Sequence, residues 1–100
     1  MYNEIIDTLY SKSDKLNWSA IPCEKGELIS KEFEARINGA TLSLGYNRIE
    51  KIWFAKYCDF QVNSYDYPLI EKIARIAEET CQVSKVKKDA SRLLMGLKTL

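Results

Sequence analysis

The sequence contains no histidine. This absence excludes the Ser-His-Asp and Cys-His pairs that activate a nucleophile, and it removes the commonest metal ligand. The three cysteines, Cys23, Cys58 and Cys81, never form a C-x-x-C pair, so no zinc site is expected. The four glycines are isolated and build no phosphate loop, dinucleotide fingerprint or nucleophile elbow. Together these absences predict a protein that is not an enzyme and holds no metal or cofactor.

Long apolar runs and an excess of charge of one sign are also missing. No run approaches the ~20 residues that cross a bilayer, and the first ten residues lack the features of a signal peptide. With 15 basic and 14 acidic residues the net charge is +1, which argues against nucleic acid as a partner. Scattered cysteines favour reduced thiols. We expect a cytoplasmic protein without membrane contact, from an AT-rich bacterial or phage gene by its Ile, Lys, Tyr and Asn content.

The composition is that of a single folded domain. One hundred residues leave room for one hydrophobic core, and no repeat, low-complexity tract or linker divides the chain. The hydrophobic fraction of 46% and the charged fraction of 29% are ordinary for a globular domain. We therefore expect residues 1–100 to form one domain.

The strongest local signal is a β-hairpin around Asn38-Gly39. Both central residues of a type I′ turn need positive φ, which asparagine and glycine tolerate. A two-residue loop here places apolar side chains on one face and polar ones on the other, so turn chemistry and polarity select one register. The expected pairs are Ile37 with Ala40, Ala35 with Leu42 and Phe33 with Leu44.

Helical and strand periodicities flank this hairpin. Apolar spacing predicts a first helix over about residues 2–14, and alternation over residues 16–20 predicts a strand. Asp66 and Pro68 mark the start of a helical stripe. This segment forms either one long helix or two helices. Because an average helix has only ~11–12 residues, a break near residues 82–84 is favoured. The stripe continues at helical spacing through Val83, Val86, Ala90, Leu93, Leu94 and Leu97.

The order of these elements predicts an α+β fold. An N-terminal helix precedes a three- to four-stranded antiparallel sheet, a meander with the Asn38-Gly39 hairpin, and the C-terminal helix or helices pack on one sheet face. This layout, together with Leu16-Asn17-Trp18 and the aromatic strand, resembles a group of small bacterial and phage α+β domains of unknown function. The resemblance covers the whole chain. The shared marks are structural, so the resemblance implies a fold and assigns no catalytic residue.

The stretch IWFAKYCDF, residues 52–60, concentrates four aromatic side chains and a cysteine. In period two, one face carries Ile52, Phe54, Cys58, Phe60 and Val62, and the other carries Ile49, Trp53, Ala55 and Tyr57. The stretch is one long strand or two strands with a turn near residues 55–57. Because free cysteine is usually buried, Cys58 is expected in the core, with a reactive thiol beside Lys56 as the alternative.

A two-layer fold leaves one sheet face without a helix, and Trp and Tyr favour interfaces. The predicted interface residues are Trp53, Tyr57, Ile49 and Lys51. The alternative is that a helix of the same chain covers Trp53 and Tyr57.

These features predict a non-catalytic protein-interaction module with an aromatic binding surface. Its partner is another protein or a second copy of the chain in a homodimer, and a phage-encoded inhibitor, an immunity protein or an accessory protein would fit. The alternatives are a nucleotide or small-molecule binder at a dimer interface and a nucleic-acid accessory protein. Both would contact phosphate through the basic cluster Lys85, Lys87, Lys88 and Arg92.

Overall fold

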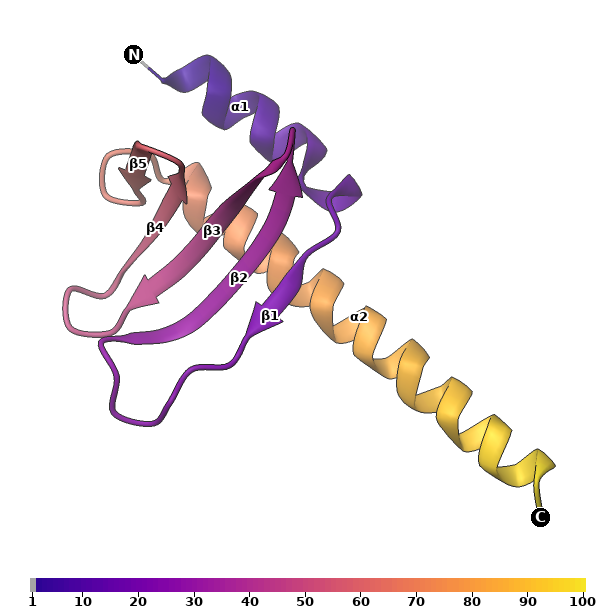
Figure 1. Ribbon diagram of the computed structural model, residues 1–100. Coiled ribbons are helices and arrows are strands. Elements are labelled where there is room, and N and C mark those ends of the chain that lie inside the picture. The colour runs from indigo at the N-terminus through magenta and orange to yellow at the C-terminus, as the bar shows by residue number, and fades with distance from the viewer. Residues whose placement is uncertain (1) are drawn as a thin grey trace.

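The chain folds into a short helix, an antiparallel sheet and a long second helix (Figure 1). The computed structural model describes residues 2–100, apart from the side chains of residues 83 and 84. The elements are α1 (Asn3–Lys12), the 3-10 turn η1 (Ser13–Lys15), β1 (Ser19–Ile21), β2 (Ile29–Ile37), β3 (Ala40–Asn47), β4 (Ile52–Tyr57), β5 (Phe60–Asn63) and α2 (Leu69–Lys98). The predicted α+β fold is confirmed, but within the described residues the sheet has five strands rather than three to four.

Each strand pairs with its neighbour in the chain, in the order β1-β2-β3-β4-β5. Asn38 and Gly39 connect β2 to β3 with φ angles of 51° and 79°. The register confirms the expected pairs Ile37–Ala40, Ala35–Leu42 and Phe33–Leu44. The apolar face chosen by this register is buried, as the sequence pattern requires.

A second two-residue turn, Cys58-Asp59, joins β4 to β5 and reverses the alternation of side chains. The pairs across it are Tyr57 with Phe60 and Ala55 with Val62. Strand β5 therefore shares its face with Tyr57 and not with Phe54, so the single period-two grouping of residues 52–62 is wrong. Cys58 has a φ of 53° and is exposed in the turn. The expectation that Cys58 belongs to the core is wrong for the same reason.

The helices cover one face of the sheet and close the core between the two layers. From α2 come Ile70, Ile73, Ala74 and Ala77, all fully buried. Helix α1 contributes Ile6, and the indole Nε1 of Trp18 donates a hydrogen bond of 2.7 Å to the carbonyl oxygen of Ser13. Burial of each large aliphatic side chain stabilises the fold by roughly 1.5–3 kcal/mol. This layer contact is the main source of stability.

Helix α2 extends well beyond this core. It is one helix of 30 residues without the break expected near residues 82–84, and its length is about 45 Å. In Figure 1 it passes the edge strand β1 and projects away from the sheet. Every residue from 85 to 100 is exposed. The radius of gyration of 15.7 Å exceeds the ~13 Å typical of 100 residues because of this projection.

The sheet face that the helices leave uncovered carries an aromatic side chain. Phe54 of β4 pairs with Gly45 of β3, and its ring lies over that glycine. A Cβ added at Gly45 would come within 2.7 Å of Phe54 Cε1, which is far inside ordinary contact distance. Gly45 therefore provides the space that the Phe54 ring occupies, and Phe54 stays half-buried on an open face.

Replacing Gly45 by alanine should destabilise the domain by about 1–3 kcal/mol, because the added methyl group displaces the Phe54 ring. Urea unfolding measures this change, and the double variant Gly45→Ala/Phe54→Leu should recover part of the loss. A Gly45→Ala protein as stable as the parent would show that the ring does not rest on this glycine.

Candidate interaction surface

The apolar residues of α2 change sides halfway along the helix. Val86 follows Ala77 by nine residues, or about two and a half turns, so the two side chains point in opposite directions. Lys88 follows Ala77 by eleven residues, about three turns, and returns to the side of the sheet. The stripe that packs on the sheet therefore ends, and a second apolar stripe begins on the opposite side.

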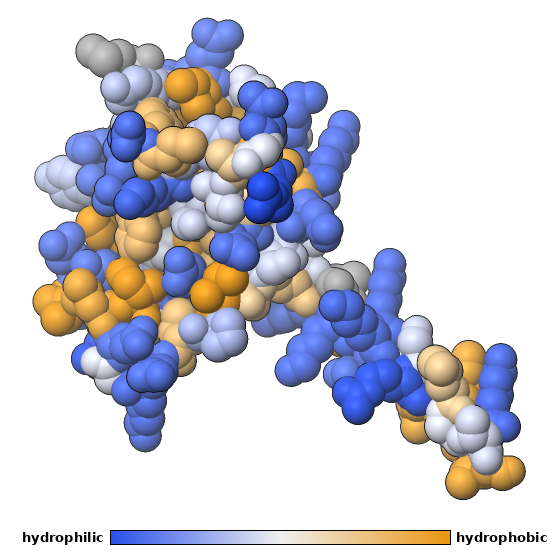
Figure 2. All heavy atoms as spheres, viewed as in Figure 1, coloured by the Kyte–Doolittle hydropathy of each residue, from blue (hydrophilic) through white to orange (hydrophobic). Residues whose placement is uncertain are grey.

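We call this second stripe the terminal seam, formed by Val86, Ala90, Leu93, Leu94 and Leu97. The side chains are well exposed, at 66% for Val86, 65% for Leu93 and 57% for Leu97. Figure 2 shows hydrophobic residues among hydrophilic ones at the far end of the projecting helix. Val83 continues the stripe in the sequence, but its side chain lies outside the described residues. The terminal seam is thus a regular apolar surface that the described residues of the chain leave uncovered.

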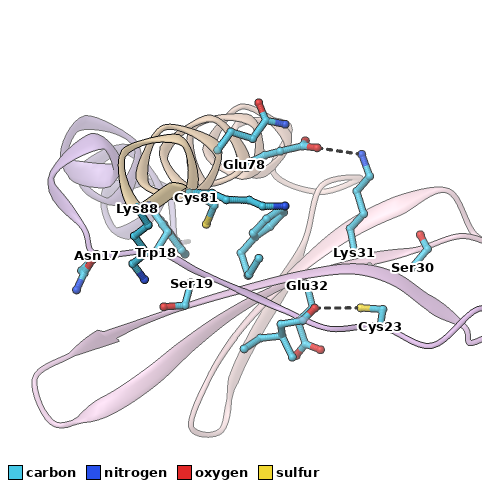
Figure 3. Close-up of a pocket in the computed structure, with 15 residues that line it drawn as sticks. Asn17, Trp18, Ser19, Cys23, Ser30, Lys31, Glu32, Glu78, Cys81 and Lys88 are labelled. Atoms are coloured by element: carbon cyan, nitrogen blue, oxygen red, sulfur yellow. Dashed lines mark hydrogen bonds and ion pairs between the residues drawn. The ribbon is translucent and has the colours of Figure 1, made fainter. Parts of the chain in front are cut away.

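The basic residues of α2 are divided between the two sides of the helix. Lys85 and Lys88 line a groove of about 680 Å³ between α2 and β1 (Figure 3). Arg92 follows Lys85 by seven residues, about two turns, and extends this row. Lys87 is two residues from Lys85, about 200° around the helix, and flanks the terminal seam. The structure thus brings three of the four predicted phosphate contacts onto one side.

The groove combines charges of both signs with two thiols. Lys31 Nζ of β2 and Glu78 Oε1 of α2 form an ion pair of 3.3 Å across it (Figure 3). Burial raises the pKa of the Cys81 thiol, and the charge of Glu78 raises it further. Burial also raises the pKa of Cys23, with the charge of Glu32 as the next cause. Both thiols therefore hold their protons at neutral pH, and neither is an activated nucleophile.

Trp53 and Tyr57 face the helices, which decides between the two arrangements that the sequence allows. Tyr57 pairs with the buried Leu42, so β4 presents these aromatics to the covered side. The Trp53 ring stacks on Phe33 with ring centroids 6.2 Å apart and an interplanar angle of 24°. The Tyr57 hydroxyl donates a hydrogen bond of 2.6 Å to the carbonyl oxygen of Ile37. Both side chains are half-buried, and the cover comes from their own domain.

Ile49 and Lys51 lie in the turn between β3 and β4. Ile49 is 70% exposed, and Lys51 adopts a φ of 59°. The turn is held by Asn47 Oδ1, which accepts hydrogen bonds of 3.0 Å from the backbone N–H groups of Ile49 and Glu50. Tyr57 ends β4 at its other end, about 20 Å away along the strand. The four residues predicted as one interface therefore do not form a continuous patch.

In comparisons with known proteins, no protein-family model, curated protein or solved structure matches the chain. Among the described residues, His, Cys, Asp and Glu side chains form no group of three that could hold a metal ion. In the same part of the chain, every helix is too short or too polar to cross a membrane. The geometry of α2 is therefore the basis for a functional proposal.

Sequence reasoning identified the residues of the terminal seam but assigned them to the stripe that packs on the sheet. Two signals distinguish the stripes. One is the offset of about half a turn between Ala77 and Val86. The other is the alternating spacing of four and three residues from Val86 to Leu97, which is a heptad pattern.

Tyr57→Phe should lower the free energy of unfolding by about 0.5–1.5 kcal/mol, because the hydrogen bond to the Ile37 carbonyl is lost. Tyr65→Phe is the matched control, since Tyr65 is 83% exposed and should leave stability unchanged. Chemical denaturation compares the two variants. Equal stability of Tyr57→Phe and the parent would contradict a structural role for the Tyr57 hydroxyl.

Proposed function

We propose that the protein is a non-catalytic protein-interaction module whose binding element is the terminal seam of α2. The observation that carries this proposal is a regular apolar stripe left exposed on a helix that projects clear of its domain. Large exposed apolar patches on folded proteins commonly mark interaction sites. An amphipathic helix binds by laying its apolar face against a groove or another helix. A phage-encoded inhibitor, an immunity protein or an accessory protein would act through such an element.

The terminal seam has no role in the core of its own domain. The buried residues of α2 run from Ile70 to Ala77, whereas Leu93 and Leu97 are exposed. The C-terminal part of α2 projects beyond the edge of the sheet (Figure 1). The apolar surface of Leu93 and Leu97 is therefore available to a partner. The predicted aromatic surface gives weaker support, because Trp53 and Tyr57 already contact other residues of their own chain.

The polar chemistry of the molecule supports a binding role rather than catalysis. Cys23 and Cys81 are held protonated, and Glu78 is paired with Lys31. The chain has no histidine to serve as a general base near neutral pH. The cysteines are free thiols, which supports a reducing compartment such as the cytoplasm.

A second candidate function is binding of phosphate or nucleic acid by the row Lys85, Lys88 and Arg92. The position of these side chains on one side of α2 supports it. Glu32 and Glu78 line the same groove as Lys85 and Lys88, and their negative charges oppose an anion there. The net charge of +1 provides no wider attraction. We therefore rank this candidate below the terminal seam.

The test compares two substitutions that place the same charge on opposite sides of one helix. Leu93→Asp puts a carboxylate in the terminal seam, and Met95→Asp puts one on the sheet side, where Met95 is 69% exposed. Both variants should keep the parent's unfolding free energy within about 0.5 kcal/mol, because neither side chain contacts the core. Tagged chains are used as bait in two pull-down experiments. One uses untagged chain as prey, and the other uses a cell extract.

Every protein retained by the parent should be retained by Met95→Asp and lost by Leu93→Asp. Loss in Leu93→Asp at unchanged stability assigns binding to the terminal seam. Retention of all partners by Leu93→Asp, or a parent that retains neither its own untagged copy nor another protein, would refute the proposed function.

A further inference from the structure

We propose that the terminal seam binds the terminal seam of a second copy of the chain, with the two helices antiparallel. This inference rests on the proposed function, because it names the partner of the same surface. The two helices would cross between residues 91 and 92, and the two sheets would lie at opposite ends of the assembly.

The heptad spacing of the terminal seam favours another helix as its occupant. Val86, Ala90, Leu93 and Leu97 fall within about 60° around the helix axis at 3.6 residues per turn. A helix that packs on a sheet or a broad surface usually presents an apolar stripe of about 100° or more, whereas a narrow stripe with heptad spacing is the contact line of a two-helix pair. Leu94 lies beside this contact line and widens the terminal seam to about 100° on one side.

The terminal seam is complementary to itself when the second copy runs in the opposite direction. Val86 then lies at the level of Leu97 of the second copy, and Ala90 lies at the level of its Leu93. The two-fold axis repeats each of these contacts. The smallest side chain of the terminal seam is thus placed opposite a leucine, so large and small side chains alternate across the contact.

The charged side chains near the terminal seam oppose association at long range but lie outside the proposed contact. Residues 85–100 carry five basic side chains and one acidic side chain, so two such helices repel each other at long range. Lys85, Lys88 and Arg92 point away from the contact, on the sheet side of each helix. Lys87 lies beside Leu94 of the second copy, where its alkyl chain covers the leucine while its ammonium group stays in water.

The shape and the area of the molecule suit a dimer of moderate affinity. The projection of α2 beyond β1 keeps the two domains apart, since the molecule is 58 Å long and 32 Å wide. Each large apolar side chain contributes about 60–120 Å² of burial at ~25 cal/mol per Å². Four such side chains from each copy, with Ala90 and Lys87, bury on the order of 1,000 Å², near the lower limit of specific interfaces.

A membrane surface is the competing occupant of a basic amphipathic helix. Helices that lie in a bilayer interface carry Trp, Phe or Leu on the apolar face, and residues 69–98 contain leucine but no aromatic residue that would sit at the headgroup level. The heptad spacing of Val86, Ala90, Leu93 and Leu97 is also that of a contact between helices. These two observations favour the second copy.

Analytical ultracentrifugation of the full chain, from low micromolar to near-millimolar concentration, tests the inference. The parent and Met95→Asp should shift from the mass of one chain to the mass of two. Leu93→Asp should weaken this association at least ~100-fold, because each dimer loses two buried leucines. Leu93→Ala serves as a second variant if Leu93→Asp does not fold, and circular dichroism checks the fold of each protein.

The dependence of binding on salt concentration distinguishes the two possible occupants of the terminal seam, a second copy of the chain and a membrane surface. Raising the ionic strength should leave the dimer unchanged or strengthen it, because the basic helices repel less when screened. Binding to vesicles of anionic phosphatidylserine would instead weaken with salt. A parent that is a folded monomer at every concentration would overturn the inference, whether or not it binds vesicles. If such a monomer still retains another protein in a manner that depends on Leu93, the proposed function survives while the self-association fails.

Disulfide trapping tests the antiparallel direction. In a background with Cys23, Cys58 and Cys81 replaced by serine, Ala90→Cys chains are mixed with Leu93→Cys chains. Glutathione disulfide oxidises the thiols and is itself reduced to two molecules of glutathione. The antiparallel pair should yield mainly mixed disulfides, because these two positions lie at the same level and within bridging reach. Predominant Leu93→Cys homodimers would indicate parallel helices and overturn the orientation.

Discussion

The packing of the first half of α2 against the sheet determines where the rest of the helix goes. Ile70, Ile73 and Ala77 are fully buried and fix the direction of the helix axis. The unbroken backbone hydrogen bonds of α2 carry that direction past β1, where the sheet ends. Residues 85–98 are therefore exposed to solvent because of the position of a core contact formed about two to four turns earlier in the same helix. An apolar stripe in this segment has no neighbour in its own domain.

This arrangement also explains how the second half of α2 can be helical at all. An isolated helix of about 16 residues is marginal in water, but the first half of α2 supplies the nucleus that is costly to form. Gly96 lowers the helical preference near the end, since glycine costs ~0.5–1 kcal/mol relative to alanine inside a helix. The segment is thus helical enough to present the terminal seam and weak enough that a partner would stabilise it.

The sequence predicted local structure better than the side of the sheet on which each residue lies. Asn38-Gly39 specified its hairpin and register because turn chemistry and polarity agree. One of the two sequence alternatives placed a turn near residues 55–57, whereas the turn lies at Cys58-Asp59, because cysteine in a left-handed conformation is not a usual turn signal. That one turn changes the face of β5, and strand alternation alone could not decide whether Trp53 faces the helices. The terminal seam was overlooked because apolar helical spacing indicates a stripe without saying what covers it.

Hydrogen–deuterium exchange at several protein concentrations tests most directly whether a partner copy stabilises the end of α2. We expect amide protection over residues 86–98 to rise with concentration, because association adds to the free energy of local opening. Protection of the turn between β3 and β4 should stay constant, since this turn opens locally and far from the second copy. Protection over residues 86–98 that is the same at every concentration would contradict the assignment of the terminal seam as a contact between copies.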